Sequence, residues 1–139
     1  MTPAGSLLPP AKQVVAQSPV HGFGVFARAA IAAGETIEEC PCLVLEPGWE
    51  KYTTVLNCYL FAWPKEGDGR AMVFGFGSIY NHAAPANVDW RFDVEKRVAT
   101  FFATRDIVPG EELFIDYSWE YWDVHDRYTG GGSHSSTTS

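Results

Sequence analysis

The sequence predicts a mostly β fold made of small, curled sheets, and three observations lead to that prediction. Apolar residues fall in short runs rich in β-branched and aromatic side chains, without long stretches at the helical spacing. These runs recur roughly every 10 residues, as they do in small β-domains. Turn dipeptides separate them, namely Ala33-Gly34, Pro47-Gly48 and Pro109-Gly110.

The first half of the chain contains three expected strands. Residues 14–16 and 25–27 are short apolar runs on either side of a glycine-containing turn. Residues 36–45 follow the turn at Ala33-Gly34 and form the longest expected strand. A short helix is expected next, over residues 49–58, because one helical face would collect four apolar side chains: Trp49, Tyr52, Val55 and Leu56.

The second half of the chain contains four further expected strands. Residues 71–74 and 88–92 are short runs with alternating or β-branched side chains. Residues 98–103 (VATFFA) consist almost entirely of good strand formers, and residues 112–115 follow the Pro109-Gly110 turn.

The chain of 139 residues has the length of one domain. The folded part is expected over residues 13–128. Residues 1–12 are rich in proline and predict a flexible N-terminus, whereas residues 129–139 predict a flexible polar tail.

Composition and charge exclude several classes of protein. Hydrophobic residues make up 46% of the chain and charged residues 19%, which supports a real core rather than disorder. The chain has 10 Lys and Arg residues and 17 Asp and Glu residues, so its net charge is −7. This negative charge disfavours direct nucleic-acid binding and favours a cationic partner. No apolar run approaches the ~18 residues of a membrane span, and no signal peptide is recognisable. We therefore expect a soluble, intracellular protein without a membrane partner, in either nucleus or cytoplasm.

Cysteine and histidine usage predicts no metal site. The cysteines, Cys40, Cys42 and Cys58, are odd in number and include no C-x-x-C pair, so buried thiols are expected. The histidines are too scattered for a metal triad that could be recognised from sequence. The phosphate-loop, zinc-protease, nucleophile-elbow and dinucleotide-binding patterns are all missing from the sequence.

Three clusters could carry chemistry, and each has a purely structural alternative. In residues 21–27 two glycines bracket an aromatic residue, which suits close approach to a ligand or a simple hairpin turn. In residues 75–87 the pair Asn81-His82 suits recognition of a polar ligand or a buried, hydrogen-bonded turn. Residues 109–117 precede Trp119, Tyr121 and Trp122, which could pack an edge or form a cage for a cation. The acidic balance favours the cage.

Taken in order, these clusters resemble the SET-domain protein-lysine methyltransferases. The G-x-G segment before V-F-A matches residues 22–27, and the I-x-x-G-E turn matches residues 31–35. The asparagine-histidine signature matches Asn81-His82 and ends at Asn87, and G-E-E-L-x-x-D-Y matches residues 110–117. Along residues 17–128 the chain is also similar to a minimal viral member of the family, and four motifs in order are far more specific than one.

The resemblance implies a SET fold with small curved β-sheets and a knot-like threaded C-terminal segment, which would bring Asn81-His82 close to Tyr117. It also implies S-adenosyl-L-methionine as the cofactor, bound on one face, with the substrate lysine entering a channel from the other. Tyr117 would orient the reacting groups, and Tyr59 and Tyr121 would line the channel. The implied cofactor-binding residues are His21, Gly22, Phe23, Gly24, Asn81, His82 and Trp122.

The chain departs from the family pattern in three respects. Alanines occupy positions 83 and 84 of the asparagine-histidine motif, and the proline stands at 85, one position early. The cysteine-rich zinc module of other members is missing from the sequence, so Trp122 would close the adenine site instead. Phe23 stands where the viral relative has tyrosine. Activity is expected because Tyr117 is retained.

The implied substrate is a lysine-containing basic protein, with a histone tail favoured. Several acidic residues could attract such a segment or form an ordinary solvated face: Glu38, Glu39, Glu46, Glu50, Glu120 and Asp123. The resemblance to the viral relative further implies a homodimer. The alternatives are a methyltransferase for a non-histone basic protein and a non-catalytic module that binds a lysine peptide; the presence of Tyr117 with Asn81 and His82 disfavours the module.

Overall fold

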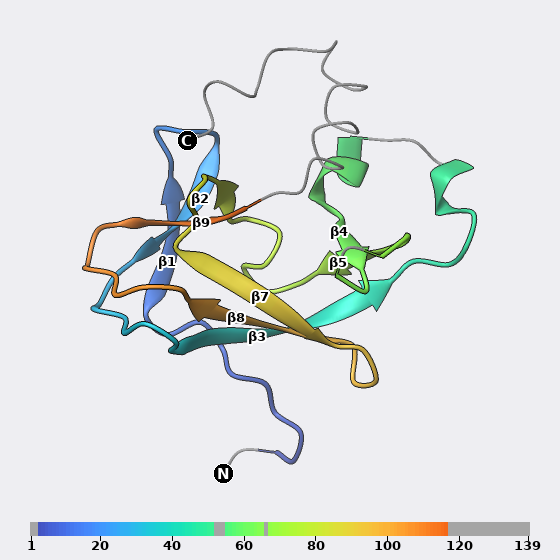
Figure 1. Ribbon diagram of the computed structural model, residues 1–139, viewed down its shortest axis with the longest axis horizontal. Helices are drawn as coiled ribbons and strands as arrows, with labels where there is room; N and C mark the ends of the chain where they lie inside the picture. The colour runs from blue at the N-terminus through green and yellow to red at the C-terminus, as the bar shows by residue number, and fades with distance from the viewer. Residues whose placement is uncertain (1–2, 52–54, 66, 117–139) are drawn as a thin grey trace.

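Two β-sheets make up the domain in the computed structural model, which describes residues 3–51, 55–65 and 67–116 (Figure 1). The four-stranded sheet has the order β1-β2-β9-β6, and the five-stranded sheet has the order β4-β5-β3-β8-β7. The mostly β fold predicted from the short apolar runs is therefore confirmed.

The four-stranded sheet joins the two ends of the domain. β1 (Gln13–Gln17) pairs antiparallel with β2 (Phe23–Ala27), and β2 pairs antiparallel with β9 (Glu112–Ile115). β6 (Asn81–His82) then adds to β9 in parallel. Because β6 has only two residues, its position depends on β9 and not on its own strand propensity.

The five-stranded sheet is centred on β3 (Thr36–Val44), which pairs antiparallel with β8 (Val98–Ala103) and β5 (Gly69–Val73). The edge strands are β7 (Val88–Asp93) and β4 (Phe61–Trp63). In β8 the side chains of Ala99, Phe101 and Ala103 are buried and alternate with more exposed ones, as expected of a strand with one core-facing side.

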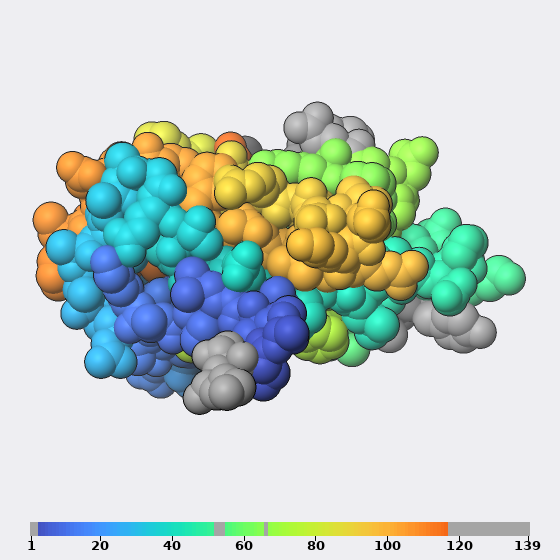
Figure 2. Space-filling model, turned by 90° about the horizontal axis from the view of Figure 1, so that it is seen from below, coloured from blue at the N-terminus to red at the C-terminus, as the bar shows by residue number. Residues whose placement is uncertain are grey.

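The hydrophobic core draws residues from both sheets and from the loops between them. Ile31 and Ile107 form an isolated β-bridge within it, and Tyr80 stacks on Phe101 with ring centroids 5.0 Å apart. At the surface, the N-terminal segment lies against neighbouring residues of the domain, as Figure 2 shows in blue. Leu8 exchanges two hydrogen bonds with Glu39 of β3, at 2.8 and 2.9 Å.

The expected helix over residues 49–58 is wrong. Two 3₁₀ helices occur there instead, η1 (Trp49–Lys51) and η2 (Val55–Tyr59). Val55 and Leu56 are each 59% exposed, so the apolar face that suggested a helix does not pack on the core. Without that packing, one or two turns cannot offset the cost of helix nucleation. The expected strands all occur, with ends shifted by at most a few residues, but β4 and β6 were not anticipated.

The three cysteines are thiols, with Cys40 and Cys58 buried and Cys42 half-buried. Burial raises the pKa of the Cys42 thiol to about 11, and it raises that of Cys40 further. None of the helices within the described ranges combines the length and apolarity that crossing a bilayer requires.

Candidate functional site

A cavity of about 1600 Å³ opens where the four-stranded sheet meets the β4 and β7 edges of the other sheet. Its wall combines apolar side chains with a few polar ones, as small-molecule sites do. Small-molecule pockets usually measure about 300–1,000 Å³, so this cavity has room for more than one ligand group.

Asn81 ties three parts of the chain together at one end of the cavity. Its side chain is buried, and Nδ2 lies 3.0 Å from the carbonyl oxygen of His21 and 3.3 Å from that of Phe23. The same nitrogen lies 2.9 Å from Oε2 of Glu112. The amide therefore holds the β1–β2 hairpin against β6 and β9, so its role is to position that hairpin.

Glu112, on β9, is the acceptor at the centre of this cluster. The Ser18 hydroxyl donates to it from the hairpin, 2.8 Å from each carboxylate oxygen, and Asn81 donates from β6. Gly24 lies directly beside the carboxylate: a Cβ placed there would overlap Oε2 of Glu112 and stand 2.9 Å from Nδ2 of Asn81. The second glycine of the G-x-G segment is thus required by a close approach of side chains.

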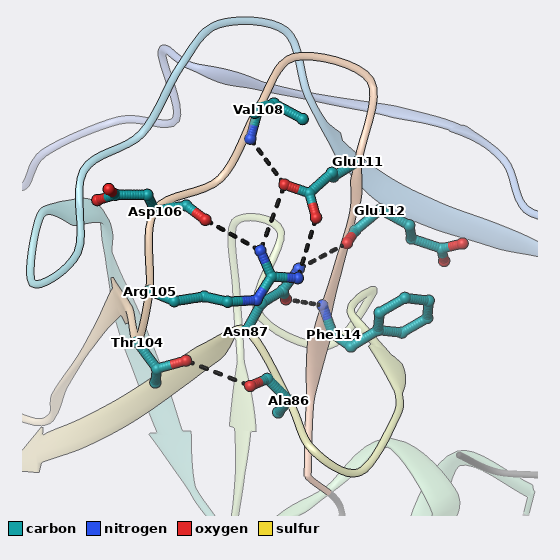
Figure 3. Close-up of polar contacts among 9 residues, drawn as sticks. All are labelled: Ala86, Asn87, Thr104, Arg105, Asp106, Val108, Glu111, Glu112 and Phe114. Carbon is teal, nitrogen blue, oxygen red and sulfur yellow. Dashed lines mark hydrogen bonds and ion pairs between the residues drawn. The ribbon is translucent and has the colours of Figure 1, made fainter.

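Asn87, the residue before β7, is hydrogen-bonded to β9 through its side chain. Its Oδ1 accepts a hydrogen bond from the Phe114 amide at 2.7 Å, and its Nδ2 donates to the Glu112 carbonyl at 2.9 Å (Figure 3). Both groups lie within the five residues that precede Tyr117 in the chain. The asparagine that ends the asparagine-histidine motif therefore fixes the approach of the strand that precedes the predicted catalytic tyrosine.

The turn before β9 is closed by an ion pair, also visible in Figure 3. Arg105 Nη2 lies 2.9 Å from Oε1 of Glu111, while Oε2 of Glu111 accepts the Val108 amide at 2.7 Å. The hydrogen bond from Arg105 is the largest cause that lowers the pKa of the Glu111 carboxyl. The pair is solvent-exposed, so we assign it a role in ordering the turn and little stability.

His82 follows Asn81 but is not among the residues that line the cavity. Its side chain is 8% exposed, and Nδ1 lies 3.6 Å from Oδ1 of Asp116, whose side chain is 64% exposed. Asp116 does line the cavity. The histidine thus packs beneath the wall next to the residue that immediately precedes Tyr117.

The opposite wall is aromatic. Tyr59 lines the cavity and is 46% exposed. Phe61 packs edge to face on Trp90, with ring centroids 5.1 Å apart. Trp90 also contacts Phe101, with ring centroids 6.3 Å apart, and Lys65, whose Nζ lies 4.2 Å from the Trp90 ring centroid. Trp90 Nε1 is buried and has no hydrogen-bond partner among the described residues, so a bound ligand could satisfy it.

The structure places the predicted site residues as follows. His21, Gly22, Phe23, Asn81 and Tyr59 line the one cavity, whereas Gly24 and His82 lie behind its wall. Tyr117, Tyr121 and Trp122 lie outside the described residues, and the knot-like threading of the C-terminal segment stays a prediction for the same reason.

Of the acidic residues expected to attract a basic substrate, Glu38 contradicts the expectation, because it is fully buried. Glu46 and Glu50 are exposed, Glu39 is half-buried, and Glu120 and Asp123 lie outside the described residues. Within the described ranges no three His, Cys, Asp or Glu side chains are grouped closely enough to hold a metal ion.

Sequence reasoning missed Ser18, Glu112 and Trp90. Glu112 belongs to a motif that carries the family resemblance and Ser18 lies shortly before another, but neither motif reveals that the two side chains meet. No sequence signal distinguishes Trp90 from an ordinary strand aromatic.

Comparisons with known proteins agree with this geometry. The SET domain family model matches residues 22–118. A Schizosaccharomyces pombe protein, the histone-lysine N-methyltransferase specific for H3 lysine-37, is 36% identical over 106 residues, which span 73% of this chain and 69% of that protein.

Among solved structures, a Plasmodium falciparum protein assigned as a histone methyltransferase superposes with a TM-score of 0.65 at 25% identity, covering 80% of this chain and 96% of that one. One chain in the structure of a humanized mutant of the Chaetomium thermophilum Polycomb Repressive Complex 2 superposes with a TM-score of 0.63 at 26% identity. The superposition covers 79% of this chain and 15% of that one.

Proposed function

The chain belongs to the SET-domain family of protein-lysine methyltransferases, and from that premise we propose that it transfers a methyl group from S-adenosyl-L-methionine to a lysine in a histone tail. One observation carries the proposal. β6 pairs in parallel with β9, Asn81 opposite Phe114 and His82 opposite Ile115, so the asparagine-histidine motif lies beside the strand that leads to Tyr117. Asn81, Ile115 and Asp116 line one cavity.

The hairpin end of the cavity fits the cofactor. The His21 and Phe23 carbonyl oxygens each have a second lone pair beyond the one used by Asn81, so they can accept from an amino group. The Phe23 ring is 62% exposed at the same place, which suits stacking or apolar contact with a ligand. When bound, S-adenosyl-L-methionine supplies a methyl group on a positively charged sulfur.

The aromatic end fits the lysine. In-line displacement requires a neutral amine held on the far side of the methyl group. A lysine in water has a pKa of about 10.4 and is therefore mostly charged at neutral pH. The side chains of Tyr59, Phe61 and Trp90 would desolvate the amine and lower its pKa, so that the proton leaves to water and no strong base is needed.

This mechanism predicts that the rate of methyl transfer rises with pH. Below the pKa of the bound amine, each pH unit should raise the single-turnover rate by about tenfold, because one proton must leave before transfer. The measurement is single-turnover methyl transfer between about pH 6 and 9, with chemistry shown to limit the rate. A flat profile would contradict the neutral-amine mechanism.

His82→Ala is expected to weaken cofactor binding more than peptide binding. The imidazole lies next to Asn81 on β6 and close to Asp116, near the end of the cavity assigned to the cofactor. Tyr59, at the end assigned to the lysine, belongs to a different segment of the chain. Removing it should loosen the hairpin contacts made through Asn81. Titration calorimetry with cofactor and with peptide separates the two effects, and equal losses for both ligands would refute this role.

The experiment that tests the function is transfer of a labelled methyl group onto mixed histones and onto a basic cell extract, followed by mass spectrometry of the products. Labelled histone lysine supports the proposal. Label on other basic proteins alone would identify the alternative substrate class. Cofactor or peptide binding without any transfer would identify a non-catalytic lysine-peptide module.

We also propose that the protein forms a homodimer, on the resemblance to a minimal viral member of the family. Val55 and Leu56 of η2 offer exposed apolar surface for such a contact. Analytical ultracentrifugation at micromolar concentration tests it, and a fully active monomer would remove the proposal.

A further inference from the structure

Glu38 of β3 is fully buried behind the cavity, and both of its carboxylate oxygens accept hydrogen bonds from one turn. Oε1 accepts from the Tyr80 hydroxyl at 2.6 Å, and Oε2 accepts from the Phe76 amide at 3.2 Å. The Cys40 thiol lies close to the same carboxyl. Among the described residues no lysine, arginine or histidine pairs with it, and burial raises its pKa.

These contacts hold the turn that ends at the asparagine-histidine motif. The carboxylate accepts hydrogen bonds from Phe76 and Tyr80, which are the first and last residues of this turn. Asn81 follows Tyr80 directly in the chain. Gly75 allows the carboxylate to come this close, because a Cβ there would stand 2.9 Å from Oε2 and its φ is +69°. The Tyr80 ring is also fixed by stacking on Phe101.

We propose that Glu38 is a positioning residue for cofactor binding: its carboxylate sets the turn from Phe76 to Tyr80 and so places Asn81 against the hairpin. This inference rests on the proposed function, because it assigns the hairpin end of the cavity to S-adenosyl-L-methionine. Asn81 transmits the effect, since its amide reaches the His21 and Phe23 carbonyl oxygens at that end.

A glutamine cannot replace this glutamate without loss. Its amide has one acceptor oxygen, whereas Phe76 and Tyr80 both present donors. If the oxygen accepts from the Phe76 amide, the glutamine NH₂ faces the Tyr80 hydroxyl, so the hydrogen bond that this hydroxyl donates to residue 38 is lost. One of the two hydrogen bonds that residue 38 accepts from the turn is therefore lost in either orientation of the amide.

The test measures S-adenosyl-L-methionine affinity by titration calorimetry for the wild type, Glu38→Gln and Tyr80→Phe. Both variants should bind the cofactor about tenfold more weakly, equivalent to about 1.4 kcal/mol. Affinity for a histone H3 tail peptide should fall clearly less than cofactor affinity, because Asn81 contacts the hairpin end directly, whereas the turn reaches Tyr59 through the Ser78 hydroxyl, which donates to the Tyr59 carbonyl at 3.2 Å. The double variant should lose less than the sum of the two single losses, since both break the same hydrogen bond.

Glu39→Gln is the matched control. It makes the same change one residue along β3, where the carboxylate accepts from the Leu8 amide and does not face the turn. Its cofactor affinity should equal that of the wild type. Tyr80→Phe keeps the ring stacked on Phe101, so it decides the question if Glu38→Gln does not fold.

Cofactor affinity unchanged in the folded variants would overturn the assignment and leave the proposed function intact. Equal weakening of cofactor and peptide would also overturn it, by showing a general loosening of the fold. Failure of the wild type to bind S-adenosyl-L-methionine would refute the proposed function, and this inference with it.

Discussion

Replacing Tyr117 with phenylalanine is expected to lower kcat by about 100-fold or more, the range found when one positioned transition-state contact is removed. The proposed role of its hydroxyl is to orient the amine and the methyl group, and phenylalanine keeps the ring but loses that donor and acceptor. Asp116, the residue before it in the chain, lines the cavity.

Single-turnover transfer at saturating cofactor and peptide measures this effect. Tyr128→Phe makes the same change outside every motif and should keep kcat within about twofold. Wild-type turnover in Tyr117→Phe would reject the proposed role. A raised KM with unchanged kcat would instead indicate that the hydroxyl contributes to binding alone.

Gly24→Ala is expected to have the second largest effect. The added methyl group would overlap the Glu112 carboxylate and crowd the Asn81 amide, so these side chains must turn away and lose the hydrogen bonds that join β9 and β6 to the hairpin. Overpacking of this kind costs about 1–3 kcal/mol, and we expect at least a tenfold loss of cofactor affinity with a lower melting temperature.

Ala16→Gly is a suitable control for Gly24→Ala. Ala16 is the exposed residue paired with Gly24 in the β1–β2 register, so its change tests the strand pair without touching Glu112. It should lower stability by about 1 kcal/mol or less and leave cofactor affinity within about twofold. Wild-type cofactor affinity in Gly24→Ala would contradict the close approach of Gly24, Glu112 and Asn81.

Much of the strand pattern was predictable, because it depends on local sequence. The concentration of strand-forming residues over residues 98–103 identifies β8 without reference to any other segment. The helix expected over residues 49–58 failed for the opposite reason: its apolar pattern needed a core surface to pack against, and Val55 and Leu56 meet none. β6 could not be predicted, since two residues form a strand only beside β9.

The candidate site was likewise predictable only in part. Motif order led to Asn81, His21, Phe23 and Tyr59, and these do line one cavity. The contact of Ser18 with Glu112 spans 94 residues of chain, and no local pattern contains that pairing. The role of Asn81 as an anchor for the hairpin was likewise visible only once its amide was seen between two carbonyl oxygens and a carboxylate.

The sequence by itself determined the class of fold, the position of most strands and the family, because periodicity, turn residues and ordered motifs are properties of the chain. Tertiary structure alone decided which polar groups meet and which are removed from water. Glu38 and Glu39 are adjacent and chemically identical, yet one is fully buried beneath a tyrosine and the other is half-buried and bonded to Leu8. Successive residues of a strand face opposite sides, so the packing of the sheet assigns each carboxylate its environment and its role.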